Sequence, residues 1–79
     1  MEKDLIKIQE WCDKNSNTFQ SWYTELWFNR DYEDEIEWGC GLLYGYSRDH
    51  ILVQHNYFSV TPAKAVKKAL KDLKNICQK

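Results

Sequence analysis

In residues 35–47 apolar side chains recur at every second position, a pattern that predicts a β-strand with two unlike faces. One face holds the three glycines of the chain, Gly39, Gly41 and Gly45. A side chain from a neighbouring strand can lie directly over such bare backbone. The opposite face, which we expect to be the core side, carries Ile36, Trp38, Cys40, Leu42, Tyr44 and Tyr46.

A second strand is predicted over residues 50–60, after a two-residue turn at Arg48 and Asp49. The length of the turn sets the register of the antiparallel pair, and the register decides which side chains share a face. The expected pairs are Tyr46 with Ile51, Tyr44 with Val53, Leu42 with His55 and Cys40 with Tyr57, with Leu52 opposite Gly45, Phe58 opposite Gly39, and Ile51, Val53 and Tyr57 facing the core.

Residues 19–30 fit either a helix or a strand. Their aromatic and threonine content favours a strand, and a third strand makes a more stable sheet than a lone hairpin. We therefore expect a strand, with a helix as the alternative. Helical spacing is matched by Phe19, Trp22, Tyr23, Leu26 and Trp27, and alternation is matched by Trp22, Thr24, Leu26 and Phe28.

Residues 3–14 predict an N-terminal helix, because Leu5, Ile8 and Cys12 share one face and Trp11 borders it. A turn at residues 15–17 ends it. With a second helix at the other end, the order is α-β-β-β-α: a single α+β domain over residues 1–79 with a three-stranded antiparallel sheet. A chain of this length buries only about 60% of its unfolded surface. Its aromatic residues, of which eleven of twelve lie in residues 19–58, must therefore supply much of the core.

Thr61 and Pro62 predict the start of the C-terminal helix, as its N-cap and first residue. Its buried stripe is expected to comprise Val66, Ala69, Leu70, Leu73, Ile76 and Cys77. The lysines of its outer surface are either ordinary solvated side chains or contacts to nucleic-acid phosphates. These lysines are Lys64, Lys67, Lys68, Lys71 and Lys74.

The net charge of −1 hides an asymmetry between the two parts of the chain. Residues 1–60 carry eleven acidic against five basic residues, whereas residues 61–79 carry six lysines against one aspartate. The two parts either neutralise each other or form separate binding patches. The densest acidic segment is either a solvated loop that protects a sheet edge or an imitation of nucleic-acid phosphates. It comprises Asp31, Glu33, Asp34, Glu35 and Glu37.

The glycine-bearing face of the sheet is the most distinctive predicted surface. If both helices cover the core face, this second face stays open, and tyrosine and tryptophan are favoured anchors of protein interfaces. We expect it to bind a partner protein, with a homodimer or cover by the first helix as alternatives. The side chains it is expected to display are Tyr23, Trp27, Leu43, Leu52 and Phe58.

No catalytic residue, cofactor site or metal site is predicted. His50 and His55 fall on opposite faces of a strand, and the neighbours Cys40 and His55 lack a group that would orient them for catalysis. Three widely spaced cysteines are typical of reduced thiols in an intracellular protein. We find no signal peptide or membrane-spanning segment, and therefore expect a cytoplasmic protein without a membrane partner.

The segment from Val60 to Leu70, with Thr61-Pro62 opening an alanine- and leucine-rich helix after a strand, resembles small phage and bacterial αβββα domains. HicB-type antitoxins and some anti-CRISPR inhibitors look like this over their last 40 or so residues. The element order is also similar to that of double-stranded-RNA-binding domains. Those domains begin the last helix with a lysine pair, where this chain has Pro62 and Ala63, and Lys67 and Lys68 follow a turn later.

These patterns together predict a non-enzymatic protein that acts by protein–protein contact. The resemblance implies a phage or mobile-element inhibitor of a host nucleic-acid-handling defence complex, with the acidic segment in a basic groove. The alternatives are a nucleic-acid-binding domain that uses the lysine-rich helix, and an antitoxin or immunity protein.

Overall fold

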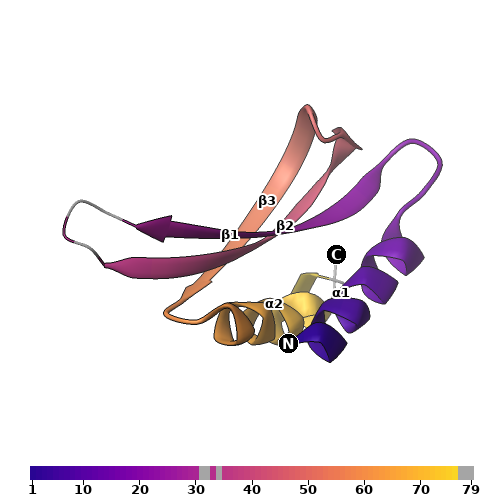
Figure 1. The fold of residues 1–79 in the computed structure, drawn as a ribbon. Helices are drawn as coiled ribbons and strands as arrows, with labels where there is room; N and C mark the ends of the chain where they lie inside the picture. The colour runs from indigo at the N-terminus through magenta and orange to yellow at the C-terminus, as the bar shows by residue number, and fades with distance from the viewer. Residues whose placement is uncertain (31–32, 34, 77–79) are drawn as a thin grey trace.

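A computed structural model describes residues 1–30, 33 and 35–76, which form a three-stranded antiparallel sheet with two helices on one side (Figure 1). The α+β order predicted from the sequence is confirmed. The strand order is β1-β2-β3, so β2 is central and the other two strands are edges. The elements are α1 (Glu2–Asn15), β1 (Ser21–Arg30), β2 (Ile36–Ser47), β3 (His50–Ser59) and α2 (Pro62–Ile76).

The segment that fitted either a helix or a strand is the strand β1, as expected. The turn before it explains why the chain leaves the helix there. The hydroxyl of Ser16 donates to the carbonyl oxygen of Cys12 at 2.7 Å and accepts from the amide of Trp22 at 2.8 Å. The side-chain oxygen of Asn17 accepts from the amide of Gln20 at 2.8 Å. These polar side chains satisfy backbone groups that a continuing helix would have used.

The core lies between the two helices and the middle of the sheet. α2 begins as predicted, since the amide of Lys64 donates to the hydroxyl of Thr61 at 3.3 Å. Ala65 was not predicted to be buried, and the expected core residue Cys77 lies outside the described residues. The buried side chains are Ile8, Cys12, Cys40, Leu42, Ala65, Val66, Ala69 and Leu73, with Leu5, Trp11, Trp22, Trp38, Tyr57, Leu70 and Ile76 packed around them.

The register between β2 and β3 is confirmed over most of its length, including Phe58 opposite Gly39 and the turn at residues 48–49. It is wrong near the turn, where Gly45 pairs with Ile51 and the register shifts on both sides of the glycine. The expected pairs of Tyr46 with Ile51 and of Leu52 with Gly45 therefore do not form. Without a side chain, Gly45 lets the backbone of the opposite strand approach closely, and the pairing becomes irregular there.

The extent of the core face was also predicted wrongly at its two ends. Ile36 and Tyr46, both expected in the core, are 41% and 57% exposed. The strands extend past the helices at both ends of the sheet, so the helices do not bury these side chains (Figure 1). Leu43 deviates in the other direction: it is only 6% exposed although it lies on the glycine-bearing face, opposite Tyr23 on the central strand.

Candidate interaction surface

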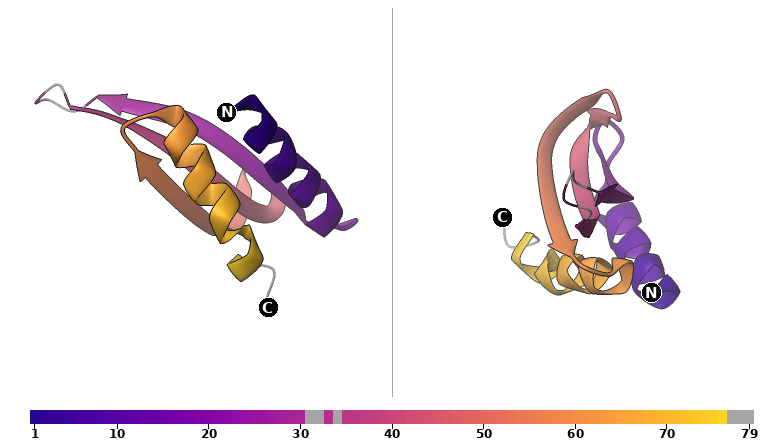
Figure 2. Two further views of the ribbon diagram at one scale, coloured as in Figure 1. Left: turned by 90° about the horizontal axis from the view of Figure 1, so that it is seen from below. Right: turned by 60° about the vertical axis from the view of Figure 1, so that its left-hand side comes forward.

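The sheet face opposite the helices, here called the far face, carries no helix in the described part of the chain (Figure 2). Side chains alternate between the two faces of each strand, so the register assigns its members. They are Tyr23, Glu25, Trp27 and Asn29 from β1, Glu37, Gly39, Gly41, Leu43 and Gly45 from β2, and Leu52, Gln54, Asn56 and Phe58 from β3.

Trp27 and Phe58 form an aromatic pair above the central strand. The indole of Trp27 lies so close to β2 that a Cβ atom added to Gly39 would be 2.5 Å from its Cζ2 atom. A Cβ atom added to Gly41 would be 2.9 Å from its Cζ3 atom. The ring of Phe58 meets the indole edge-on, with 6.0 Å between the ring centroids, and is 38% exposed. The glycines therefore fix the position of a half-exposed apolar anchor.

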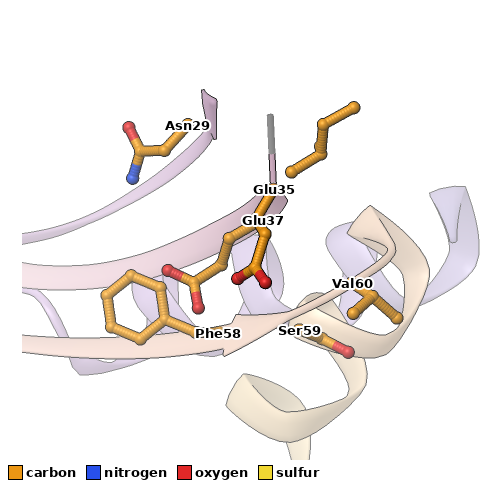
Figure 3. Close-up of a pocket in the computed structure, with 7 residues that line it drawn as sticks. Asn29, Glu35, Glu37, Phe58, Ser59 and Val60 are labelled. Carbon is orange, nitrogen blue, oxygen red and sulfur yellow. The ribbon is translucent and has the colours of Figure 1, made fainter. Parts of the chain in front are cut away.

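Beside this pair lies a hollow of about 270 Å³ with acidic walls (Figure 3). The side chains of Glu35 and Glu37 line this hollow together with the ring of Phe58. Both glutamates are exposed. An apolar ring next to two carboxylates suits a cationic side chain with a long apolar stem, such as lysine or arginine. The hollow is lined by Asn29, Glu35, Ile36, Glu37, Phe58, Ser59 and Val60.

The predicted aromatic site is thus split into two parts. Trp27 and Phe58 lie together, whereas Tyr23 lies further along β1 under the guanidinium of Arg48, 5.6 Å from the ring centroid. Between them Glu25 stands opposite Gly41. Neither Glu25 nor Asn29 was predicted, although both share the alternation that placed Tyr23 and Trp27 on this face.

The predicted acidic segment is described only in part. Asp31 and Asp34 lie outside the described residues, and Glu33 is exposed at the turn that joins β1 to β2. Glu35 and Glu37 are exposed and line the acidic hollow. The described part of this segment thus lines one hollow with Phe58, a member of the same predicted partner-binding set.

The lysines of α2 are exposed, as predicted, and begin where the acidic hollow ends. The ammonium of Lys68 donates to the carbonyl oxygen of Phe58 at 2.5 Å, which ties α2 to the outer edge of β3. Ser59 belongs to both the acidic hollow and a second, basic hollow. This second hollow is lined by Ser59, Lys64, Lys67, Lys68 and Lys71.

The titratable groups with shifted pKa values lie on the helix-bearing side. Burial and, to a smaller extent, nearby Cys12 together raise the pKa of Cys40 to about 11, so this thiol stays protonated near neutral pH. His55 stands opposite Leu42, and its ring stacks on Trp22 with 6.5 Å between centroids.

Among the described residues, no group of three or more His, Cys, Asp and Glu is placed to hold a metal ion. No helix in the described ranges is long and apolar enough to span a membrane.

Tyr57 ties the sheet to α2, because its hydroxyl donates to the carboxylate of Asp72, which also accepts from Asn75 at 2.8 Å. Burial and this bond raise the pKa of Tyr57, whereas the same bond and that from Asn75 lower the pKa of Asp72. Because the pKa of the tyrosine is higher in the folded than in the unfolded protein, the interaction stabilises the fold below pH about 10, and this stabilisation is lost at higher pH. Because the pKa of the aspartate is lower in the folded protein, its contribution to stability is present above pH about 4 and is lost at lower pH.

We therefore expect Tyr57→Phe to be destabilising mainly between these two limits. The difference in unfolding free energy between wild type and Tyr57→Phe should narrow at both the acidic and the alkaline end. Urea titrations at a series of pH values measure it. A difference that stays constant with pH would contradict the role of the hydrogen bond.

No protein-family model, curated protein or solved structure matches this chain. The resemblance to HicB-type antitoxins and anti-CRISPR inhibitors over residues 60–70 accordingly stays a prediction. The function of the far face is argued below from its geometry and charge.

Proposed function

We propose that this protein binds another protein through the far face, with Trp27 and Phe58 as apolar anchors and the glutamates beside them as the charge that selects a basic partner. The observation that carries this proposal is the aromatic pair, held over glycines on a face that no described helix covers and next to an acidic hollow. Buried aromatic side chains near the centre of an interface commonly contribute most of its binding energy.

The charges of the far face favour a basic partner over a second copy of the chain. Among the described residues, Glu25 and Glu37 lie on this face and Glu35 lines the hollow at its edge, while the guanidinium of Arg48 lies over Tyr23 further along β1. Packing two such faces together would place like charges opposite each other, which is unfavourable. A partner with lysine or arginine side chains would instead find complementary charge and an aromatic ring to stack on.

The more specific form of the proposal is inhibition of a nucleic-acid-handling protein. Such a protein holds phosphates in a groove lined by lysine and arginine. Carboxylates carried beside an aromatic anchor can occupy the same groove and exclude the nucleic acid. Inhibition then requires no catalysis by this chain: it follows from steric and electrostatic competition alone.

We expect Phe58→Ala and the double charge reversal Glu35→Lys/Glu37→Lys each to weaken partner binding at least about tenfold, or 1.4 kcal/mol. The measurement is capture on the immobilised protein from cells that naturally make it, followed by titration of the purified partner. Added duplex DNA should displace a partner held through a nucleic-acid groove. The matched control is Lys67→Ala/Lys71→Ala on the opposite side, which should bind as wild type does.

Equal capture of the same partner by wild type and both far-face variants would refute the proposal. The alternative, nucleic-acid binding by α2, is supported by the basic hollow lined by Lys64, Lys67, Lys68 and Lys71. It predicts a gel shift at low salt that weakens steeply as salt rises and disappears in Lys67→Ala/Lys71→Ala. Absence of any shift at low salt removes this alternative.

A further inference from the structure

The outer edge of β1 presents backbone groups that no other strand of the described residues pairs with. β1 pairs with β2 alone and stands at the edge of the sheet. The amide of Trp22 donates to Ser16 outside the sheet, so its backbone groups point away from β2. Because backbone groups alternate in direction along a strand, those of Thr24, Leu26 and Phe28 point the same way.

α1 runs beside this edge (Figure 2). Side chains of α1 and β1 line a groove between the helix and the strand. The groove has a volume of about 450 Å³. One side offers backbone donors and acceptors, and the other offers helix side chains of mixed polarity. It is lined by Leu5, Gln9, Cys12 and Asp13 from α1, by Trp22, Tyr23, Thr24 and Leu26 from β1, and by Arg48.

The opposite edge of the sheet, formed by β3, is protected against pairing with a further strand, unlike the edge formed by β1. The ammonium of Lys68 donates a hydrogen bond to the carbonyl oxygen of Phe58, and the pairing of β3 with β2 is irregular around Gly45. Charged side chains and bulges are common devices against unwanted strand pairing. The ten residues Ser21–Arg30 contain no lysine and no proline, and their register with β2 is unbroken. An edge of this kind accepts another strand.

We propose that the outer edge of β1 binds an extended peptide segment of another protein, which adds a fourth strand to the sheet beside α1. Thr24, Leu26 and Phe28 exchange backbone hydrogen bonds with it. Its alternate side chains face Leu5 and the polar side chains of α1 on one side and the carboxylate of Glu25 on the other. This site adjoins the far face, with which it shares Tyr23 and Glu25, but it does not rest on the function proposed above.

A second copy of the chain is a less suitable occupant of the groove. Joining two β1 strands into one sheet brings both α1 helices to the same side of the joined edge, where they compete for space. An isolated extended segment has no such helix and leaves the α1 side chains of the groove in place. The occupant is therefore a peptide strand with alternating apolar and basic or polar side chains.

Amide hydrogen exchange followed by NMR tests the proposal, with the capped peptide acetyl-Lys-Val-Thr-Val-Lys-Val-Thr-Val-amide as the probe. In the free protein the outward amides of Thr24, Leu26 and Phe28 should exchange fast, because no strand among the described residues pairs with them. The peptide should slow all three at least about tenfold, while Glu25 and Trp27, already bonded to β2, change little. The same peptide N-methylated at alternate residues should have no effect, because one edge of its backbone is blocked.

A pair of variants at one position separates the backbone from the side chain. Leu26→Pro removes an outward amide without removing a bond to β2, and should abolish the protection. Leu26→Ala and the far-face variant Phe58→Ala should retain it. If Leu26→Pro does not fold, as circular dichroism would show, the N-methylated peptide alone decides.

Three outcomes would overturn the proposal. The first is equal binding of the N-methylated peptide, and the second is unchanged exchange at saturating amounts of the unmodified peptide. The third is protection of the three amides that appears without peptide and grows with protein concentration. That last result would assign the edge of β1 to a dimer.

Discussion

Gly45→Ala is expected to lower the unfolding free energy by about 3 kcal/mol, the upper part of the range for overpacked interiors. The new Cβ atom would collide with the carbonyl oxygen of His50 and lie 2.8 Å from the Cα atom of Ile51. Both are backbone atoms of the paired strand and cannot rotate away. For 79 residues the total stability is of the order of 4–12 kcal/mol, so such a loss is easily measured by urea denaturation.

Gly41→Ala is the matched control, on the same strand and the same face. Its Cβ atom would meet only side-chain atoms, the closest being Cζ3 of Trp27 at 2.9 Å and the Oδ1 atom of Asn56 at 3.2 Å. These groups can shift, so the variant should be clearly more stable than Gly45→Ala. Equal stability of the two variants would show that the backbone at the β2–β3 turn is less constrained than the structure indicates.

Outside residues 19–30, where helical spacing and alternation competed, the secondary structure was predictable because local signals and the hydrophobic pattern agreed. The alternation of β2 and the Thr61-Pro62 helix start both point to the elements observed. The irregular pairing at Gly45 was not predictable, because a two-residue turn is compatible with a regular register. It depends on how closely two backbones approach, and only tertiary structure fixes that distance.

The candidate site was predictable as a list of residues but not as an arrangement. Alternation placed Tyr23, Trp27 and Phe58 on one face, and the structure agrees. It could not show that Trp27 lies flat over the glycines or that Glu37 meets Phe58 in one hollow. Side-chain direction within a face depends on neighbours two strands away, and these are distant in sequence.

The close approach of Trp27 to Gly39 predicts the second large effect. Gly39→Ala should destabilise the protein by about 2 kcal/mol, because the new Cβ atom would lie 2.5 Å from the Cζ2 atom of the indole and force the ring off the strand. In a Trp27→Ala background the same change should leave the unfolding free energy unchanged or raise it slightly, since alanine reduces the entropy of the unfolded chain. The two changes should therefore couple by about 2 kcal/mol in a double-mutant cycle built from urea midpoints.

This cycle also links stability to the far face. If Gly39 and Gly41 exist to hold the indole flat, then Gly39→Ala must displace the apolar anchor and weaken partner binding along with stability. Leu52→Ala is the matched control, since this exposed side chain shares the far face but stands apart from Trp27. Additive stability changes for Gly39→Ala and Trp27→Ala would show that the glycine does not position the indole. The tryptophan would then not be held rigidly on the far face, and rigidity is what makes a partly buried side chain an effective anchor.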